Sequence, residues 1–585
     1  MATTYAQQVT CDPTVGDCRA ELSGLQPGLW SHHISVTGAG GESQRQWRRM
    51  LLLDRSAGTS ELTWPIFASV ITINSLSDAL GCTGCLRSAL GAVGALPKPA
   101  LIQFAPGLTG SVTRSPGLPA LAASDVTLDA IAPDGVPWER TIDGSGLDES
   151  ALVITGARNF IVGLRFSNVG GNADVVLITG ENANGNVLSQ VQVVGRALVT
   201  CGSGLDGCLV DGSCRIPGGT QPQGVCGDDG IAVRSGGSVE PNRIEHCDVS
   251  GAYDKGIKVS DGGVAMVTDS VIHDNRDGGI QATLSGNVTA LRNVIENNRG
   301  DDSANGLAAN GPSAATQSLP ARLTTRGNLT RNNSLRGISV RSFSVVSLQD
   351  DYACGNGTLG RGTGLGLAVL GDADLFPTLT VRGVASVYNL DSGVNVAGTA
   401  VVDFGVVADP GYNVFTGNGA ASIVANFQNA SPAPIDALVN QWEHCGRRPV
   451  CDDAAIAAAD VGGPVTFSPA LSSRWNHDTF IEAVDPSSGA AGDLVRVYGR
   501  GFDAIEGQPR DGSCATIALN NRCLPNRGNC VRVGQVDAEV IAITPTMLIV
   551  KLPTTCVSPT TLSVRARHGQ KRLQTRFCFE PNEAE

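Results

Sequence analysis

The middle of the chain alternates apolar and polar residues in short runs, and one such run recurs at nearly constant intervals. Each copy begins with a glycine, followed by a branched apolar residue and an alternating segment. Copies begin at Gly230, Gly256, Gly279, Gly306, Gly337, Gly366 and Gly393, with spacings of 26, 23, 27, 31, 29 and 27 residues. Strict alternation over a few residues predicts half-buried β-strands. A repeat of this length predicts stacked structural units.

Asparagine precedes many of these copies, and a second strand signal lies between them. The asparagines are Asn275, Asn298, Asn333, Asn356, Asn389 and Asn418. One coil of short strands cannot bury its apolar residues, so coils must stack with paired strands about 4.8 Å apart. Like residues then stack, and buried asparagines can hydrogen-bond along the stack. Helical and propeller repeats need longer units. The repeat therefore predicts an all-β, right-handed parallel β-helix.

The same pattern begins before Gly230, at Ser124, Ala151, Phe160 and Asp174. We expect about ten coils and a rod roughly 50 Å long at the strand spacing. The cysteine-rich stretch 201–226 interrupts the repeat and predicts a projecting loop held by disulfides.

The open ends of such a solenoid must be covered. Residues Ser75 to Gly94 predict an amphipathic helix, with Leu86, Ala89, Leu90 and Val93 at helical spacing. We expect this helix to cover the first coil. Two strands upstream, in GLWSHHISVTG and RQWRRMLLLD, predict a small N-terminal β element.

The run from Cys85 to Leu90, followed by ALIQFAPGLTGSV, LPALAASDVTLDA and TIDGSG, resembles the start of bacterial surface β-helix repeat proteins. Their signature is Cys-Ser-Leu-Arg-Glu-Ala; here one serine is missing and Ser88 stands where glutamate is usual. The resemblance covers about residues 70 to 145. The repeats themselves resemble the pectate-lyase-like superfamily, which includes lyases, hydrolases, epimerases, tailspikes and adhesins, so this resemblance implies the fold and leaves the activity open.

The segment from Phe480, FIEAVDPSSGAAGDLVRVYGRGF, resembles the opening of immunoglobulin-like IPT/TIG domains. Later alternating runs supply further strands. We therefore divide the chain into an N-terminal β element (1–69), a capping helix with the start of the β-helix (70–123), the β-helix (124–445), a cap and linker (446–478) and an IPT/TIG-like β-sandwich (479–585).

Composition and charge narrow the function. Lys and Arg number 42 and Asp and Glu 55, so the net charge is −13 and we expect no nucleic-acid partner. No stretch approaches the roughly 20 apolar residues of a transmembrane segment. The first ten residues have no signal-peptide pattern and resemble a mature N-terminus with an added Met.

Seventeen cysteines indicate an oxidising compartment, and an odd number leaves at least one thiol unpaired within the chain. Neighbouring cysteines predict local disulfides: Cys11 and Cys18, Cys82 and Cys85, Cys201 and Cys208, Cys214 and Cys226, Cys445 and Cys451. The C-terminal region, with Cys514, Cys523, Cys530, Cys556 and Cys578, is expected to include two more. The alternative, a zinc site at the CTGC motif, lacks a second ligand pair at suitable spacing. We expect a secreted or cell-surface protein.

The repeat also aligns candidate functional residues. Setting Gly230, Gly256 and Gly279 in register places three acids in one column, namely Asp228, Asp254 and Asp277, and Asp229 beside Lys255 in the next. Stacked carboxylates repel, and calcium, which binds six to eight oxygens, would relieve this. Resemblance to polysaccharide lyases of the superfamily implies roles: Lys255 as base with Lys258 as substitute, Arg276 binding the uronate carboxylate, and Asp228, Asp229, Asp254 and Asp277 holding calcium.

Two other interpretations stay open. Aspartate before glycine is an ordinary turn choice, and nearby Lys and Arg would then form solvated pairs. A glycoside hydrolase would need facing carboxylates, for which Asp301 and Asp302 with Asp277, or Asp350 and Asp351, are candidates. His246 and His273 fall on different columns and are interpreted as structural or surface residues.

Whether the chain is an enzyme is left undecided, with a calcium-dependent lyase favoured over a hydrolase. We expect binding of an extracellular polysaccharide or a cell-envelope component. A purely structural surface protein is the remaining alternative.

Overall fold

The computed structural model describes the chain in several stretches. Residues 67–471 are described except 115–116, 133–136, 145–148, 168–172, 196–228, 238, 300–303, 313–318, 358–364, 373–374, 420–425 and 446–450. Strands are described between residues 11 and 65 by their backbone, and parts of residues 480–574 are described as well. The chain divides into two compact units, residues 68–473 and a second that comprises 1–67 and 474–585.

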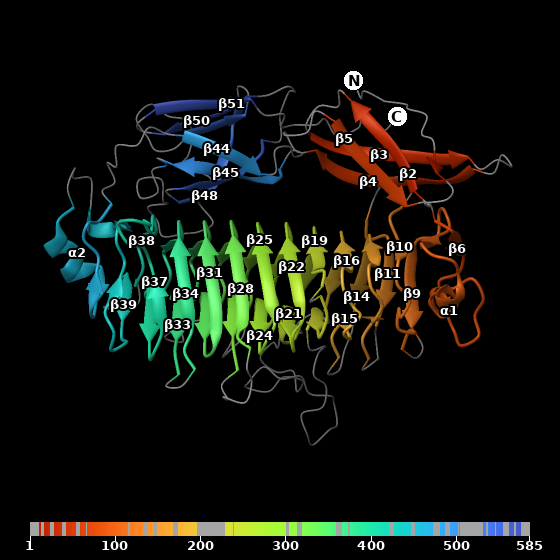
Figure 1. Cartoon of the computed structure of the whole chain (residues 1–585), viewed down its shortest axis with the longest axis horizontal. Helices are drawn as coiled ribbons and strands as arrows, with labels where there is room; N and C mark the ends of the chain where they lie inside the picture. Colours follow the sequence, from red (N-terminus) through yellow and green to blue (C-terminus); the bar gives the residue numbers. More distant parts are fainter. Residues whose placement is uncertain are drawn as a thin grey trace, which may run out of the picture. The chain divides into compact units, whose positions relative to one another are not determined.

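Residues 68–473 form a parallel β-helix in which most coils contribute one strand to each of three sheets, and the coils are stacked side by side from α1 to α2 (Figure 1). Sheet 1 contains β6 (Ser69–Ile73), β8 (Ala100–Phe104), β10 (Val126–Asp129), β13 (Phe160–Val162), β16 (Val187–Ser189), β19 (Asn242–Glu245), β22 (Val264–Thr268), β25 (Asn287–Leu291), β28 (Ala321–Arg326), β31 (Ser344–Gln349), β34 (Thr378–Arg382) and β37 (Val401–Asp403).

Sheet 2 contains thirteen short strands in the same parallel order: β7 (Ser77–Asp78), β9 (Gly110–Arg114), β11 (Arg140–Asp143), β14 (Leu164–Ser167), β17 (Gln192–Val194), β20 (Asp248–Ser250), β23 (Val271–His273), β26 (Val294–Glu296), β29 (Leu329–Arg331), β32 (Tyr352–Cys354), β35 (Ala385–Val387), β38 (Val414–Thr416) and β41 (Gln441–Trp442).

Sheet 3 contains the glycine-led copies of the repeat. Its strands are β12 (Leu152–Ile154), β15 (Val176–Thr179), β18 (Ile231–Arg234), β21 (Lys255–Ser260), β24 (Gly278–Thr283), β27 (Asn305–Asn310), β30 (Arg336–Arg341), β33 (Leu365–Leu370), β36 (Val394–Ala397), β39 (Phe427–Asn429) and β42 (Val461–Gly462). The solenoid has about twelve coils rather than the ten expected, because paired strands begin at Ser69 and end at Gly462.

The core runs along the inside of the three sheets. In sheet 3 the inward residues are aliphatic in successive coils, such as Ile257, Ile280 and Leu307, which are register partners and fully or almost fully buried. Each inward side chain therefore packs on its counterpart in the coil above and below. This stacking explains why the sequence repeats the apolar positions and varies the outward ones.

The predicted asparagine column is confirmed. Asn275, Asn298, Asn333, Asn356, Asn389 and Asn418 lie at the turn between sheets 2 and 3. The Asn298 Oδ1 accepts hydrogen bonds from the Asn275 backbone N at 3.0 Å and from its Nδ2 at 3.1 Å, and the same two bonds recur up the column. Backbone donors buried at the turn are thereby satisfied.

The N-terminal end is covered by α1 (Leu86–Ala92) and the short 3₁₀ helix η1 (Val93–Ala95). Leu86, Ala89, Leu90 and Val93 are buried, as the helical spacing predicts. The prediction of one helix from Ser75 to Gly94 is wrong at its start, because Ser77–Asp78 instead pairs with β9 in sheet 2. Gly81 and Gly84 have φ of 81° and 66°, which a helix does not permit, so the helix starts only after Cys85 caps it.

The other end of the solenoid contains a cluster of large aromatic residues. Phe404, Phe415, Phe427 and Trp442 are almost fully buried, and ring centroids of Phe404 and Phe427 lie 4.8 Å apart. The 3₁₀ helix η2 (Glu443–Cys445), α2 (Asp453–Ala459) and a strand pair of β40 (Ile435–Asp436) with β43 (Val465–Thr466) follow. In the described part of the chain no helix is both long and apolar enough to cross a membrane.

Two of the predicted local disulfides lie among residues with described side chains, and both form: Cys82–Cys85 and Cys445–Cys451. Cys247 is a buried free thiol, and burial raises its pKa to about 12. Cys11 and Cys18 face each other across an antiparallel strand pair, but their side chains lie outside the described residues. The same is true of Cys201, Cys208, Cys214 and Cys226.

The second unit is antiparallel. Its N-terminal strands are β1 (Cys11–Asp12), β2 (Asp17–Ser23) and β5 (Thr59–Pro65) in one sheet, and β3 (Gly28–Thr37) with β4 (Ser43–Leu53) in a hairpin, which confirms the two strands expected there. Its C-terminal strands form two four-stranded sheets: β44 (Phe480–Asp485), β45 (Leu494–Arg500), β49 (Met547–Lys551) and β48 (Glu539–Ile543); and β47 (Val536–Asp537), β46 (Cys530–Val533), β50 (Thr561–Ala566) and β51 (Gly569–Gln574).

Candidate functional site

The register expected from the glycines is confirmed on sheet 3. Ile231 pairs with Ile257, and Lys255 pairs with Gly278. Asp229 and Lys255 therefore occupy one column, one residue before the repeat glycine. Asp254 and Asp277 occupy the preceding column, where the Asp277 N donates to the Asp254 carbonyl O at 2.8 Å. Asp228, expected in that column, lies outside the described residues.

Five of the predicted residues form one ionic cluster. The Lys255 Nζ contacts Asp254 Oδ1 and lies 3.9 Å from Asp277 Oδ2. The Lys258 Nζ lies 2.9 Å from Asp254 Oδ2 and 3.4 Å from Asp229 Oδ2. We call these five residues the lysine cluster. Each ammonium group contacts carboxylates from its own and a neighbouring coil, so parallel stacking brings together charges distant in sequence.

Burial makes these charge contacts consequential. Lys255 is 4% exposed, and Asp229 is fully buried. Burial by itself would raise the pKa of the Asp254 carboxyl, but the charges of Lys255 and Lys258 outweigh it, so this pKa lies below its ordinary value. Asp254 is therefore ionised near neutral pH. Charges this deep are retained only with partners.

Arg276 belongs to the next coil and immediately precedes Asp277 of the lysine cluster. Its guanidinium stacks over the Tyr253 ring, 4.3 Å from the centroid, one coil away. This cation–π contact orients the side chain at the turn before β24. The three basic residues assigned to a lyase thus lie on adjacent coils, where Lys255 contacts Asp254 and Arg276 stacks on Tyr253.

The aspartates of the lysine cluster were expected to bind calcium, and their contacts show which groups would compete with the ion. Among described residues, Asp78, Cys82 and Cys85 form one group with potential donor atoms within 4.8 Å of one another, and Glu443, His444 and Asp460 form the other. In the lysine cluster the carboxylates contact two ammonium groups, with which a calcium ion would compete. These carboxylates are therefore not favourable calcium ligands while both lysines are charged. Calcium binding stays a prediction that a calcium titration can test.

The charged column continues beyond the residues that sequence reasoning identified. In register with Lys255 follow Gly278, then Asn305, then Arg336. On the other side, Asp174 aligns with Asp229, and its Oδ2 pairs with Arg234 Nη2 at 2.8 Å. The missed signal was present in the sequence: Arg336 precedes Gly337 as Lys255 precedes Gly256.

The carboxylates considered for a hydrolase are described only in part, so the hydrolase hypothesis stays a prediction. Asp301 and Asp302 lie outside the described residues. Asp351 is fully buried and accepts hydrogen bonds from Asn328 N and Nδ2, both at 2.9 Å. It occupies an asparagine position between sheets 1 and 2, so its carboxyl group is part of the stack.

His273 lies on the outside of sheet 2. Its Nε2 lies 3.0 Å from Asp248 Oδ1 and its Nδ1 2.7 Å from Asp274 Oδ2. Bonding to Asp248 is the main cause that raises the pKa of His273 to about 9. His246 is at a turn with φ of 53°. These positions agree with the structural or surface role expected for both.

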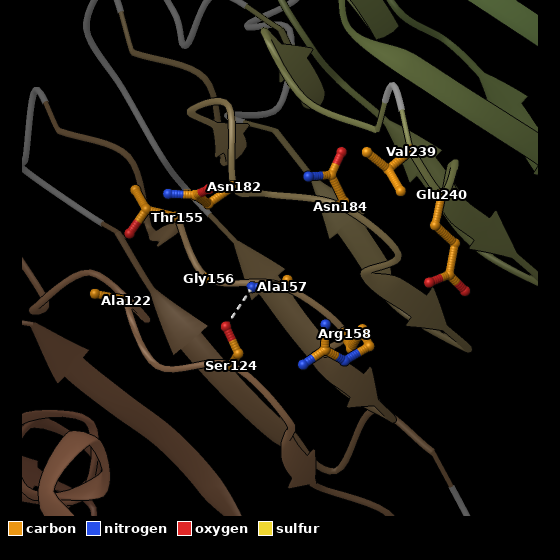
Figure 2. A pocket seen from close by; sticks show the side chains of 10 residues that line it. All are labelled: Ala122, Ser124, Thr155, Gly156, Ala157, Arg158, Asn182, Asn184, Val239 and Glu240. Atoms are coloured by element: carbon orange, nitrogen blue, oxygen red, sulfur yellow. Dashed lines mark hydrogen bonds between the residues drawn. The ribbon is translucent and has the colours of Figure 1, made fainter.

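A pocket of about 450 Å³ lies at the turns that lead from sheet 3 into sheet 1 (Figure 2). It is lined by Ala122, Ser124, Thr155, Gly156, Ala157, Arg158, Asn182, Asn184, Val239 and Glu240. The Ser124 Oγ accepts a hydrogen bond from the Ala157 N at 2.9 Å, and Arg158 Nη2 pairs with Asp125 Oδ2 at 2.7 Å. The lining offers hydroxyl, amide and backbone groups to a polar ligand.

Comparison with known proteins supports the fold and leaves the activity open. A family model described as a right-handed β-helix region matches residues 150–374, so this part of the chain is a right-handed β-helix. No curated protein matches the sequence.

Several solved structures are similar at low identity. One is a periplasmic alginate epimerase, at 10% identity over 68% of this chain and 81% of that one, with a TM-score of 0.34. Another is the mannuronan C-5 epimerase A-module of Azotobacter vinelandii, at 14% identity over 66% of this chain and 94% of that one, with a TM-score of 0.30. A third is the tailspike of Acinetobacter baumannii bacteriophage Fri1, a capsular polysaccharide depolymerase. It has 10% sequence identity over 93% of this chain and 95% of that one, and the TM-score is 0.34. These low scores transfer no activity to this chain.

Proposed function

We propose that this protein is secreted or displayed on a cell surface, and that it binds an extended extracellular polysaccharide on the outer face of sheet 3. One observation carries the proposal. Four buried ionisable side chains, Asp174, Asp229, Lys255 and Arg336, share one column of that sheet. Burying a charge destabilises a fold unless the charge is paired. Asp174, Asp229 and Lys255 have partners of opposite charge, whereas Nε and Nη1 of Arg336 have no hydrogen-bond partner among the described residues. A regular row of polar groups suits a ligand that repeats along its length.

Neighbouring columns on this face supply hydrogen-bonding groups. Gln281 and Thr283 on β24 and Asn310 on β27 are partly exposed, while Ile280 and Ala282 between them point into the core. Successive coils would present these groups at about 4.8 Å intervals. Amide and hydroxyl groups are donors and acceptors for sugar hydroxyls.

Disulfides support the location. Cys82–Cys85 and Cys445–Cys451 both lie in the β-helix unit, and such bonds persist in oxidising compartments. We also propose that residues 479–585 are an immunoglobulin-like module of the IPT/TIG kind that acts as a spacer or adhesion domain. Two four-stranded antiparallel sheets support this assignment.

Affinity electrophoresis tests the binding proposal directly. The full chain is run through gels that contain polygalacturonate, dextran sulfate or neutral dextran. We expect retardation by at least one polysaccharide, and loss of it in a Gln281→Ala/Asn310→Ala variant. A Thr289→Ala/Thr324→Ala variant, on the outside of sheet 1, is the matched control. Equal retardation of both variants would place the binding surface elsewhere, and no retardation in any gel would remove the polysaccharide proposal.

The lyase hypothesis has its own test. β-Elimination leaves an unsaturated uronate that absorbs in the ultraviolet, so incubation with polygalacturonate or alginate gives a direct readout. A signal that chelation and Lys255→Ala both abolish would establish a calcium-dependent lyase at the lysine cluster. Binding without any such product would leave the protein as a binding module.

A further inference from the structure

Two arginines lie at the ends of one sheet-3 strand. Arg336 begins β30 and Arg341 ends it, with Ser339 between them. Ile338 and Val340 of the same strand point into the core, so the alternation places Ser339 and Arg341 on the outer face. Arg336 stands in the charged column that also contains Lys255.

Four polar atoms of these residues are buried and have no hydrogen-bond partner among the described residues. Arg336 is 8% exposed, and its Nε and Nη1 have no hydrogen-bond partner among the described residues. Ser339 is 2% exposed, and its Oγ has no partner in the described structure either. Within the same described stretches, Arg341 Nε is a fourth such atom. Buried donors without acceptors destabilise a fold, so these four atoms require an explanation.

The charges around Arg336 do not compensate for its burial. Burial, followed by repulsion from Arg341, lowers the pKa of Arg336 to about 10. Its neighbours in the adjacent coils are Asn305 and Leu365, which carry no charge. Burial also lowers the pKa of Arg341, and Asp372 opposes this only in part. The Asp372 Oδ2 accepts a hydrogen bond from Ser342 Oγ at 2.8 Å.

A purely structural role accounts poorly for this arrangement. Leu365 occupies the Arg336 position one coil further on, so the fold accepts an apolar residue there. An oxyanion would accept the hydrogen bonds for which the described protein offers no acceptor. Guanidinium groups present several donors in a fixed plane that matches carboxylate or sulfate oxygens. A serine hydroxyl donates one more bond to the same kind of group.

We propose that Arg336, Ser339 and Arg341 form an oxyanion site, and that this site holds an acid group of the polysaccharide. The first part stands on these residues alone, whereas the second rests on the proposed function and deepens it. The ligand class is then an anionic polysaccharide with carboxylate or sulfate groups. A free inorganic oxyanion offers the same chemistry, so the test separates the two sources.

Calorimetric titration of the full chain with polygalacturonate, dextran sulfate and neutral dextran measures the site. We expect binding of an acidic polysaccharide, and a loss of at least about tenfold in affinity in Arg336→Leu and in Arg341→Gln, equivalent to about 1.4 kcal/mol. Arg322→Gln is the control, because Arg322 is an exposed arginine on sheet 1. It should change the affinity less than about twofold, as expected of a distant surface charge.

Sodium sulfate, compared with sodium chloride at equal ionic strength, provides the second readout. We expect sulfate to raise the Tm of the wild type and to have no specific effect on Arg336→Leu. We also expect Arg336→Leu to melt above the wild type without ligand, because it removes an unsatisfied buried charge. A Tm lowered in both Arg336→Leu and Arg336→Gln, with anion binding unchanged, would overturn the site.

The outcomes separate the two proposals. Sulfate stabilisation that depends on Arg336, without any polysaccharide binding, would sustain the oxyanion site and remove the proposed function. Polysaccharide binding that is equal in wild type, Arg336→Leu and Arg341→Gln would sustain the function and remove the oxyanion site. Retention of dextran as tightly as its sulfated form would refute the anionic ligand class.

Discussion

Lys255 and Arg336 occupy the same column of sheet 3, three coils apart, and their charges have opposite surroundings. Lys255 contacts Asp254, lies near Asp277, and shares its cluster with Lys258 and Asp229. Arg336 lies between Asn305 and Leu365, and the charge that most affects it is another cation, Arg341. Identical backbone positions thus hold one cation that the protein neutralises and one that it does not.

The difference separates structural from ligand-directed charge. In the lysine cluster, partners compensate for desolvation, so removing one charge leaves others buried and unpaired. At Arg336 no described carboxylate compensates, so removing the charge relieves the fold. The same kind of substitution at the two positions should therefore change stability in opposite directions.

The largest expected effect is at Lys255. Lys255→Leu should lower the free energy of unfolding by about 4 kcal/mol, because Asp254 and Asp277 lose a nearby ammonium group. Chemical denaturation of the β-helix unit within the full chain measures it. Adding Asp254→Leu should recover part of the loss, and a Lys255→Leu protein as stable as the wild type would contradict the paired interpretation.

Asp351 extends the comparison to a buried acid without a cation. Burial raises its pKa to about 7, from 3.8. The folded state therefore binds the proton more tightly, and stability falls as pH rises from about 4 through 7. Asp351→Asn, which matches the asparagines of the stack, should stabilise by about 3 kcal/mol near pH 9 and by little near pH 4.

Thermal melts of Asp351→Asn and wild type across this pH range give the measurement. The pH dependence should flatten in the variant. Asp350→Asn is the neighbouring control, because Asp350 lies beside Arg326 at 3.4 Å. A gain that is independent of pH would mean that packing, and not the proton, distinguishes Asn from Asp at this position.

Arg336→Leu is expected to have a smaller effect of opposite sign. It should raise the free energy of unfolding by about 2 kcal/mol, because a buried and unsatisfied charge is replaced by the residue type found at Leu365. The same denaturation experiment as for Lys255→Leu gives the comparison within one column. Destabilisation at both positions would show that Arg336 is as well accommodated as Lys255.

His273 forms a partly exposed charge pair, for which we expect the smallest effect on stability. Its pKa is raised to about 9, mainly by Asp248, so its contribution to stability is complete below pH 6.5 and disappears as pH rises through 9. His273→Gln should lose about 1 kcal/mol near pH 6 and little near pH 10, since exposed pairs are screened. NMR titration of the His273 ring measures the pKa, and a value near 6.5 would contradict the pairing.

Much of the fold followed from the repeat. The glycine register of Gly230, Gly256 and Gly279 and the asparagine column were predicted because stacked coils require identical residues at equivalent positions. The same register placed Asp229 beside Lys255 correctly. Helix boundaries were not predictable, because Gly81 and Gly84 adopt positive φ and β7 pairs across coils, which local pattern does not record.

The candidate site shows where sequence alone stopped. The sequence alone places Lys255 and Arg336 in one column, because each residue immediately precedes a repeat glycine, Gly256 or Gly337. Whether each charge has a partner depends on side chains from neighbouring coils and on burial, and only the tertiary structure decided that. Coulomb interaction and desolvation act through space over a few ångströms, so they also couple residues such as Lys255 and Asp277, which lie on neighbouring coils and 22 positions apart along the chain.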